Sequence, residues 1–414
     1  MFKYGGVFIA ALALFGCGGE GGSSSDAPAQ QNAKVGQFKD SSVSGISYRI
    51  GSETKITGEE GLFYYQENDT IEFEIGSLRL GKSIAKPFLT PLDLTAESDP
   101  RNPTNIKIVR VLMGLDDDGN PENGIQISEE LISYLTSELD MSHFSFSDDD
   151  LSVLTTGFSY QDKNGNTRTL DLPNSEQAIE HFEETLRCNT AGVYAGEVNH
   201  SIEGEGRVGF ILVVDPADLD THAFIIPISE EEESFERSLD YPYLTGKRLN
   251  LFAGDKTIDF TSEDGDSFSF TTRIVNQAEV AGEWDYESEG LSGTLEGEKQ
   301  LSWELQGEKK YVGLFTRTPS LAGLDKPTGI IQFIEYEDNH LRIDVYDIET
   351  GMEHTTESRM NEDGSYSILI EHESNSYSDY VTISLPKDGN LLQTTSEGEA
   401  TGAEYNFNLS SCRL

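Results

Sequence analysis

The sequence predicts a mainly β protein, with a small N-terminal β-sandwich and packed helices, followed by a larger antiparallel β-sandwich or barrel domain. Three observations lead to this fold class. Apolar and polar residues alternate over residues 41–94, and helical periodicity is confined to residues 105–187. From residue 190 onward, short apolar runs recur between turns rich in Asp, Gly and Asn. Alternation with a period of two is typical of half-buried strands, and many short strands joined by such turns indicate a sandwich or barrel.

The first 16 residues are predicted to be an export signal. A Lys precedes an apolar stretch from Val7 to Phe15, and small residues lead into Cys17. The stretch is too short to span a bilayer, which needs about 20 apolar residues. Leu14-Phe15-Gly16-Cys17 resembles the bacterial lipobox, and this resemblance implies that the thiol of Cys17 is lipidated after cleavage. The alternative is an ordinary signal peptide followed by an incidental cysteine.

Residues 17–40 are predicted to form a flexible tether between the anchor and the folded part. They are poor in apolar residues and rich in Gly, Ser, Ala and Gln, so they cannot bury a core. Bacterial lipoproteins carry three acyl chains, and each buried methylene contributes about 0.8 kcal/mol to anchoring. Gly18 and Gly19 follow the cysteine, which by the same resemblance favours the outer membrane. The expected location is therefore a lipid anchor in the outer membrane, at its periplasmic face or at the cell surface.

The length of the chain limits the number of domains, and its charge limits the classes of partner. With 414 residues it is long enough for two or three domains. Its 74 acidic and 29 basic residues give a formal net charge of −45. Such a field repels phosphate backbones, so we expect no nucleic-acid partner. It also opposes contact with anionic lipid, so the membrane is expected to be a partner only through the anchor.

The cysteine pattern predicts one disulfide. The chain has three cysteines, and if Cys17 carries lipid, Cys188 and Cys412 remain. An even pair in an oxidising compartment favours a disulfide, and two free thiols are the alternative. In the chain-entropy model a loop of this length stabilises the fold by roughly 4–5 kcal/mol.

Residues 41–96 are predicted to form the small β-sandwich. In the run TIEFEI, Ile71, Phe73 and Ile75 alternate with Glu72 and Glu74. The layout SGISY…GEEGLFYY…DTIEFEIGSLRLG resembles extracytoplasmic modules related to transthyretin-like and carboxypeptidase-regulatory domains. With TPLDL and a helix leading to LDDDG, residues 41–187 also resemble an N-terminal module of surface lipoproteins and adhesin-like proteins of marine γ-proteobacteria. That family has no settled activity, so the resemblance implies a fold and a location only.

Residues 97–187 are predicted to be a helical appendage and connector. The run NIKIVRVLMGL follows Pro103 and is apolar on nearly all sides, so this helix should be buried. Ser128 is placed to cap the helix ISEELISYLTSEL. A third helix, NSEQAIEHFEETLR, begins near Asn174 and has an apolar face. That face is formed by Ala178, Ile179, Phe182 and Leu186.

Residues 188–414 are predicted to be one antiparallel β-domain. Strand candidates run from GVYAGEV and RVGFILVV to YVTISL and EYNFNL, separated by Asp-Gly and Gly-Asn turns. AGVYAGEV, AGEWDYES and KYVGLFTR echo one another, which raises the hypothesis of a duplicated unit. The pattern resembles lipocalin-like barrels and other lipoprotein β-domains at the level of architecture only.

The stretch LDDDGNPENGI, residues 115–125, has two interpretations. Asp116, Asp118 and Asn120 match the first three ligand positions of an EF-hand-like calcium loop. The match then fails, because Pro121 replaces the required Gly and Ile127 replaces the twelfth-position Glu. A different calcium loop would be completed by Glu122 or Asn123. The alternative is an Asx-turn that ends the preceding helix without an ion.

Other chemistry has little support in the sequence. It contains no GxSxG, P-loop or dinucleotide motif, and its seven histidines lack zinc-ligand spacing. Glycosidases use a pair of carboxylates, but among 74 acidic residues some pair will always lie close together. Such a pair therefore does not predict a hydrolase. Aromatic residues offer either a stacking platform for sugars or ordinary core packing. These are Trp284, Trp303, Tyr241, Tyr243 and Tyr286.

We therefore expect a lipid-anchored, non-enzymatic protein of the outer membrane that acts as a binding or adhesion module. Its expected partner is a surface glycan or a protein, and calcium is the one candidate cofactor. The first alternative is a carrier of a small apolar ligand inside a lipocalin-like β-domain. The second is a carbohydrate-active hydrolase.

Overall fold

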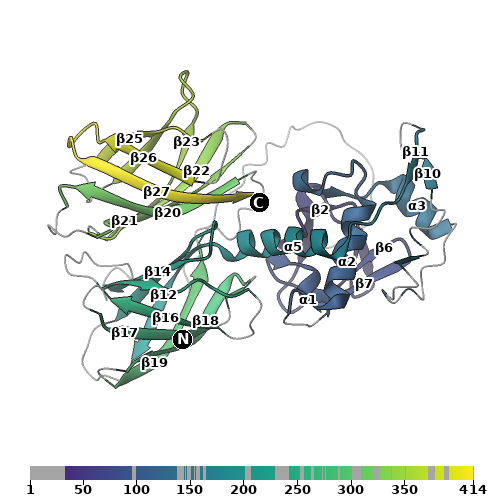
Figure 1. Cartoon of the computed structure of the whole chain (residues 1–414), viewed down its shortest axis with the longest axis horizontal. Coiled ribbons are helices and arrows are strands. Elements are labelled where there is room, and N and C mark those ends of the chain that lie inside the picture. Colours follow the sequence, from purple (N-terminus) through teal and green to yellow (C-terminus); the bar gives the residue numbers. More distant parts are fainter. Residues whose placement is uncertain are drawn as a thin grey trace, which may run out of the picture. The chain divides into compact units, whose positions relative to one another are not determined.

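The computed structural model confirms a mainly β fold that includes a closed antiparallel barrel (Figure 1). No helix in the part of the chain that it describes is both long and apolar enough to cross a membrane. It describes residues 33–413 except 96–98, 138–143, 145, 147–150, 153, 155–158, 162–164, 201–206, 229–241, 252–255, 263–264, 273, 276, 288–289, 301–308, 321–325, 337, 350, 372–377 and 387–390.

The N-terminal part contains two facing sheets, in the orders β5-β1-β8 and β4-β3-β6-β7. Both sheets supply one core, in which the ring of Phe73 stacks on Phe38 at 4.4 Å and meets the edge of Phe63 at 5.6 Å. A short parallel pair, β2 with β9, adds to this part. The strands are β1 (Lys34–Phe38), β2 (Val43–Ser44), β3 (Ser47–Ile50), β4 (Glu53–Ile56), β5 (Leu62–Tyr65), β6 (Thr70–Ile75), β7 (Leu78–Ile84), β8 (Phe88–Leu89) and β9 (Ile125–Gln126).

The predicted tether boundary at residue 40 is too late. Residues 34–38 form β1, which pairs with β5 and β8 in the middle of the first sheet. Phe38 is fully buried there. Its ring packs against Phe73 of the facing sheet, and one buried aromatic residue in a mostly polar segment was too weak a pattern to predict a strand.

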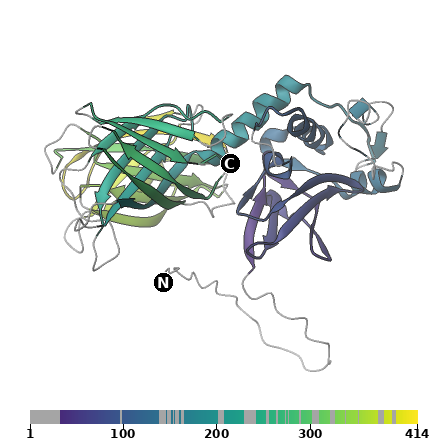
Figure 2. The ribbon, with the colours of Figure 1, turned by 90° about the horizontal axis from the view of Figure 1, so that it is seen from below.

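Helices α2 (Pro103–Leu115) and α5 (Ser175–Thr190) connect the N-terminal sheets to the strands that follow. In Figure 2 the teal helix α5 and the blue helices lie over the purple-to-blue strands. One face of α2 joins the core of the N-terminal sheets through Ile108 and Leu112, and the other meets α5 through Ile106 and Val109. Asn174 caps α5 in a capping box with Gln177. The remaining helices are α1 (Pro91–Thr95), α3 (Glu129–Ser137) and the 3₁₀ turns η1 (Glu59–Gly61) and η2 (Pro121–Asn123).

Eight antiparallel strands, β12 to β19, close into a barrel. Its interior holds large side chains, including Tyr194, Phe210, Phe260 and Phe270, all of them buried. Residues of α2 and α5 belong to the same core, so the helices cover apolar surface of the barrel. The strands are β12 (Gly192–His200), β13 (Val208–Val214), β14 (Thr221–Pro227), β15 (Tyr243–Gly246), β16 (Lys256–Ser262), β17 (Ser267–Thr272), β18 (Glu279–Tyr286) and β19 (Leu291–Lys299).

The last strands form a second β-domain with its own core. Its main sheet has the order β23-β22-β21-β20-β27-β26, and β24 pairs with β25. Both sheets supply the core, for example Phe333 and Tyr405 from the first and Ile368 and Val381 from the second. The strands are β20 (Lys309–Thr318), β21 (Gly329–Glu335), β22 (His340–Asp347), β23 (Met352–Arg359), β24 (Tyr366–Glu371), β25 (Ser378–Ile383), β26 (Leu391–Glu397) and β27 (Glu404–Arg413).

Residues 188–414 thus contain two successive β-domains where the sequence predicted one. GVYAGEV is β12 and KYVGLFTR is β20, and each opens one domain as the echo suggested. AGEWDYES does not open a unit, because it contributes to β18 near the end of the barrel. The remaining two short strands, β10 (Ser159–Gln161) and β11 (Thr167–Thr169), form a separate hairpin.

An apolar contact holds the outer faces of the two β-domains together. Val193, Ile211 and Phe224 point out of the barrel and pack with Ile330 and Tyr346 of the second domain. Strands β12 to β14 are therefore apolar on both faces, one for the barrel core and one for this contact. The contact buries apolar side chains from both β-domains, so it contributes to the stability of the pair.

The C-terminal end of α5 is attached to both β-domains. The predicted disulfide is formed between Cys188 on α5 and Cys412 on β27, with Cα atoms 5.6 Å apart. The buried side-chain nitrogen of Lys310 donates to the carbonyls of Cys188 at 2.6 Å and Ala191 at 2.7 Å, and that of Lys299 donates to the carbonyl of Asn189. Cations are favoured at a helix C-terminus, where carbonyls lack helical partners. Burial and the nearby Lys39 lower the pKa of Lys310 to about 7.

Candidate functional site

A cleft of about 580 Å³ lies beside the apolar contact between the β-domains. This volume is within the range of roughly 300–1,000 Å³ typical of small-molecule sites. One wall comes from β20, β26 and β27, and the other from β13, β14 and β15. Val213 lines the cleft and also belongs to the apolar contact, so the site is built directly onto that contact.

The first wall carries two parallel rows of side chains across three hydrogen-bonded strands. The register aligns Leu314, Asn408 and Gln393 in one row. It aligns Thr316, Asn406 and Thr395 in the next row, two residues along each strand. Residues two apart on a strand share a face, so all six point to the same side of the sheet.

Hydrogen bonds between the strands orient the polar members of both rows. Gln393 Nε2 donates to Asn408 Oδ1 at 3.1 Å, and Thr395 Oγ1 donates to Asn406 Oδ1 at 2.6 Å. Asn406 Nδ2 also donates to Glu404 at 3.1 Å. Cross-strand pairs of this kind stabilise a sheet and restrict the rotamers of the paired side chains. The wall therefore presents amides and hydroxyls that are paired across the strands and accessible to solvent.

The second wall has an aromatic surface formed by His222 and Tyr243. The two rings are within 7° of parallel, and Tyr243 Oη lies 2.9 Å from His222 Nδ1. Burial lowers the pKa of His222, and the nearby carboxylates of Asp215, Asp220 and Asp218 partly oppose this shift. His222 is therefore favoured as a neutral ring that bonds to a phenol.

Charged groups are scarce in this cleft, although one residue in four of the chain is charged. Among its described lining residues, Asp215 is the one carboxylate, and lysine and arginine are absent. Its Oδ1 accepts from the backbone amide of Ala217 at 2.6 Å, and burial raises its pKa above the ordinary value. The cleft is thus suited to a ligand that exchanges hydrogen bonds with neutral groups.

Among the described residues, the aromatic side chains that the sequence suggested as a sugar-stacking platform do not all lie together. Tyr243 lies in the cleft wall. Trp284 is partly buried against the barrel core and donates to the carbonyl of Asn199, and Tyr286 stacks on Phe268. Tyr241 and Trp303 lie outside the described residues, as does Cys17.

The acidic loop after α2 is organised by hydrogen bonds within the chain. Asp116 Oδ1 accepts from the backbone amide of Gln126 at 2.9 Å. Asp118 accepts from the amide of Asn120 at 2.8 Å and from Nδ2 of Asn123 at 2.9 Å. These bonds favour the Asx-turn interpretation. One feature favours a cation: Asp116 is 8% exposed, and its Oδ2 has no hydrogen-bond partner among the described residues.

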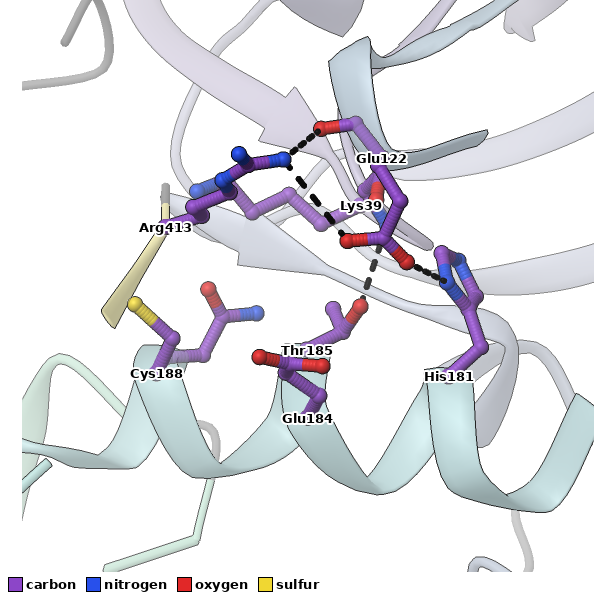
Figure 3. Close-up of a pocket in the computed structure, with 9 residues that line it drawn as sticks. Lys39, Glu122, His181, Glu184, Thr185, Cys188 and Arg413 are labelled. Carbon is purple, nitrogen blue, oxygen red and sulfur yellow. Dashed lines mark hydrogen bonds and ion pairs between the residues drawn. The ribbon is translucent and has the colours of Figure 1, made fainter. Parts of the chain in front are cut away.

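Glu122 does not join the other four predicted calcium ligands. Figure 3 shows its carboxylate between His181 of α5 and Arg413 of β27, at 3.9 and 3.8 Å. These residues line a small polar cavity of about 30 Å³, enough for roughly one water. Within the described residues, no group of three or more His, Cys, Asp or Glu side chains is arranged to hold a metal ion.

Replacing Asp118 with Ala should destabilise the protein by about 1 kcal/mol, equally in millimolar calcium and in chelator, because the lost partners are an amide and a side chain of the turn. Thermal unfolding of the native protein and of Asp118→Ala in both conditions measures this. A calcium-dependent rise in Tm that is present in the native protein and missing in Asp116→Ala/Asp118→Ala would establish the ion site instead.

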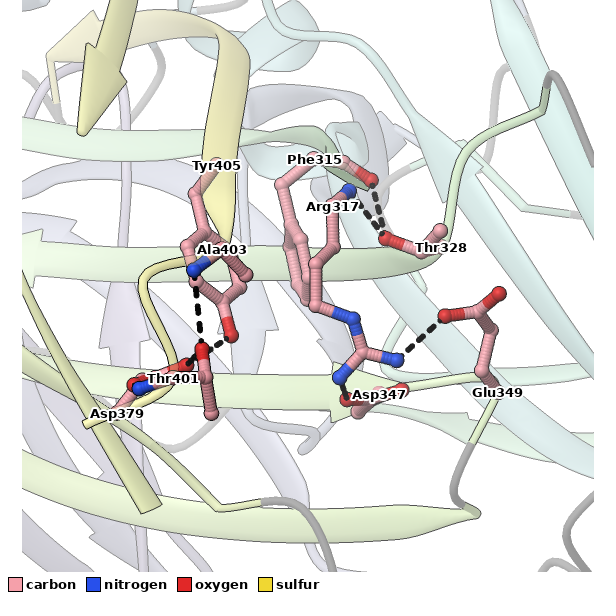
Figure 4. A network of polar contacts seen from close by, with 9 residues as sticks. All are labelled: Phe315, Arg317, Thr328, Asp347, Glu349, Asp379, Thr401, Ala403 and Tyr405. Atoms are coloured by element: carbon pink, nitrogen blue, oxygen red, sulfur yellow. Dashed lines mark hydrogen bonds and ion pairs between the residues drawn. The ribbon is translucent and has the colours of Figure 1, made fainter. Parts of the chain in front are cut away.

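A second polar cluster lies inside the C-terminal β-domain (Figure 4). Buried Arg317 pairs with Glu349 at 2.6 Å and with Asp347 at 3.8 Å. Asp379 accepts from both the amide and the hydroxyl of Thr401 and from Tyr405 Oη at 2.8 Å. Burial opposes ionisation of Asp379, but these hydrogen bonds outweigh it and hold its pKa below the ordinary value. Such paired, hydrogen-bonded groups indicate a structural anchor rather than a reactive site.

The sequence did not reveal the amide rows. Gln393 and Thr395 lie on β26, which has too few apolar residues to read as a strand, and β23 escaped prediction for the same reason. Asn406 and Asn408 lie on a predicted strand but carried no functional signal. The one available hint was their alternation with Tyr405, Phe407 and Leu409, which places both asparagines on the solvent face.

Comparison of the chain with protein-family models found no matching family, and comparisons with curated proteins and with solved structures found no match.

Proposed function

We propose that this chain is a lipid-anchored, non-enzymatic binding protein of the cell envelope, and that the cleft between its β-domains holds the ligand. The observation that carries the proposal is the cleft itself. It combines a volume of about 580 Å³ with rows of neutral hydrogen-bonding groups paired across strands and an aromatic wall. Such convergence of a few oriented polar groups in a concave site is characteristic of ligand binding.

The envelope location rests on the sequence and is consistent with the disulfide. A lipobox-like Cys17 is followed by a segment poor in apolar residues, which extends to the start of β1. Disulfides such as Cys188–Cys412 persist in oxidising compartments. Globomycin is expected to block processing, and mass spectrometry is expected to find fatty acids on Cys17. An unmodified mature N-terminus would remove the anchor from the proposal.

The two alternatives have less support from the described residues. A carrier of apolar ligands needs an apolar cavity, whereas the barrel interior holds the packed rings of Phe210, Phe260 and Phe270. A glycosidase uses two carboxylates that flank the scissile bond. Asp215 stands as the one carboxylate among the described lining residues of the cleft.

Filling the cleft should abolish ligand binding without unfolding the protein. Thr316 is half-buried in the amide wall, so Thr316→Trp places an indole in the cleft. We expect the full chain to bind at least one member of a panel of neutral oligosaccharides, acidic polysaccharides, peptides and fatty acids, and Thr316→Trp to weaken that binding about tenfold or more. Isothermal titration calorimetry gives both affinities.

The matched control is Thr257→Trp, because Thr257 is exposed on β16 and lies outside the cleft lining. It should bind as the native protein does. Fatty-acid binding that survives Thr316→Trp would favour the carrier alternative, and binding of every ligand at full affinity by both variants would overturn the cleft proposal.

A further inference from the structure

We infer that the cleft recognises a neutral, hydroxyl-rich oligosaccharide. This inference rests on the proposed function, since it names the ligand class of the same cleft. Four features of the cleft favour such a ligand: the hydrogen-bonding capacity of the amide rows, the spacing of these rows, the aromatic wall and the charge of the surroundings.

The amide rows retain both donors and acceptors for a ligand. An amide side chain has two N–H donors and a carbonyl oxygen with two lone pairs. The bond from Gln393 Nε2 to Asn408 Oδ1 leaves the Gln393 carbonyl and the Asn408 amino group without another partner among the described residues. An adjacent donor and acceptor match a pair of sugar hydroxyls, because each hydroxyl both donates and accepts.

The spacing of these groups forms a regular grid. Neighbouring strands lie about 4.8 Å apart, and residues two apart on a strand lie about 6.6 Å apart. The polar members of the two rows, on β20, β26 and β27, therefore repeat on the scale of a sugar ring in both directions. Several hydroxyls of one short chain thus meet polar partners at the same time.

The opposite wall suits the apolar face of a sugar. The parallel rings of His222 and Tyr243 are joined by a hydrogen bond, and Val213 lies on the adjacent strand β13. The C–H groups on one face of a pyranose pack against aromatic rings, while its hydroxyls extend sideways to polar partners. The cleft offers both kinds of contact on facing walls.

Electrostatics disfavour anionic ligands in this cleft. The described lining residues provide no cation to pair with a uronate or sulfate, and Asp215 together with the net charge of −45 repels polyanions. A purely apolar ligand would remove water from the Gln393 carbonyl and the Asn408 amino group without replacing its hydrogen bonds, at a cost of about 1–3 kcal/mol for each group. A neutral, hydroxyl-rich ligand avoids both penalties.

The test uses linear hexasaccharides of glucose with different linkages, maltohexaose, cellohexaose and laminarihexaose, titrated into the full chain. Alginate oligosaccharides serve as the anionic probe. We expect at least one neutral probe to bind, and Gln393→Leu to weaken its binding about tenfold. The substitution removes the hydrogen bond of Gln393 to the ligand and also leaves Asn408 Oδ1 without the donor that Gln393 supplied. Gln393→Leu/Asn408→Leu should weaken binding further.

The matched control is Gln161→Leu. Gln161 is exposed and donates across the β10–β11 hairpin to Thr167 at 2.8 Å, so the same substitution removes a similar cross-strand bond away from the cleft. Its affinity should equal that of the native protein. Failure of all neutral probes to bind, or equal weakening by Gln161→Leu, overturns the inference.

The panel separates this inference from the proposed function. If alginate, a peptide or a fatty acid binds and Thr316→Trp abolishes that binding, the cleft is a ligand site of another class and only the oligosaccharide inference is overturned. If no ligand of any class depends on Thr316, both the inference and the proposed function are overturned.

Discussion

Replacing Arg317 with Leu should lower the free energy of unfolding of the C-terminal β-domain by about 3–5 kcal/mol. The guanidinium is 5% exposed and lies 2.6 Å from Glu349 and 3.8 Å from Asp347, whose side chains are also buried. Removing the cation takes a buried counter-charge away from both carboxylates. Urea unfolding followed by near-ultraviolet circular dichroism measures the loss.

The control for this prediction is Arg359→Leu. Arg359 pairs with Asp338 at 3.6 Å, but its side chain is 77% exposed, and surface ion pairs contribute at most about 1 kcal/mol. A similar loss in the two variants would show that the buried triad has no special role. Neutralising the acids as well, in Arg317→Leu/Asp347→Asn/Glu349→Gln, should recover part of the stability, because the loss of the Arg317 charge beside two buried carboxylates, and not the loss of packing, causes most of the effect.

Reduction of the disulfide between Cys188 and Cys412 should lower stability by about 5 kcal/mol in the chain-entropy model. The cysteines are 224 residues apart in sequence, and the loop between them contains both β-domains. Without the bond, the unfolded chain gains the entropy of that whole loop. The urea midpoint of the oxidised protein, compared with that of Cys188→Ala/Cys412→Ala, measures the effect.

Two observations check that the disulfide itself is responsible. The native protein in reductant should unfold with the same midpoint as the double alanine variant, and reductant should not shift the variant further. Thiol titration of the unfolded, unreduced protein should find no reactive group at these two positions. Two reactive thiols there would contradict the predicted bond.

The cleft depends on features of both β-domains that are far apart in the chain. Strands β16 to β19 of the barrel and β20 to β26 of the second domain lie between Tyr243 and Asn408 in the chain. The apolar contact through Val193, Ile211 and Phe224 brings their strands together. A large-to-small change in that contact should therefore affect ligand affinity as well as stability.

Several elements followed from local patterns alone. The period-two run around Phe73 became β6, the apolar run after Pro103 became α2, and the helix predicted to begin near Asn174 became α5. The disulfide between Cys188 and Cys412 was predicted from the even number of cysteines left after Cys17 and from the expected oxidising compartment, and the bond is present. These predictions succeeded because each depends on neighbouring residues, or on a count that needs no geometry.

Other features were decided by tertiary contacts. Residues 34–38 look like a tether, and become a central strand only because β5 and β8 supply partners on both sides. Strands such as RVGFILVV are apolar on both faces, and their alternation does not say which face lines the barrel and which meets the second domain. One predicted β-domain became two for the same reason, since strand periodicity carries no information on where a sheet closes.

The sequence by itself determined the class of fold, the order of the helices, the disulfide partners and the expectation of an exported, anchored and strongly acidic protein. The tertiary structure alone decided where a ligand fits. Amides on β26 and β27 become a site only opposite the rings of β14 and β15. The physical reason is that side-chain alternation specifies two faces for each strand, whereas a cleft requires two distant faces to be brought together by burial of apolar surface elsewhere.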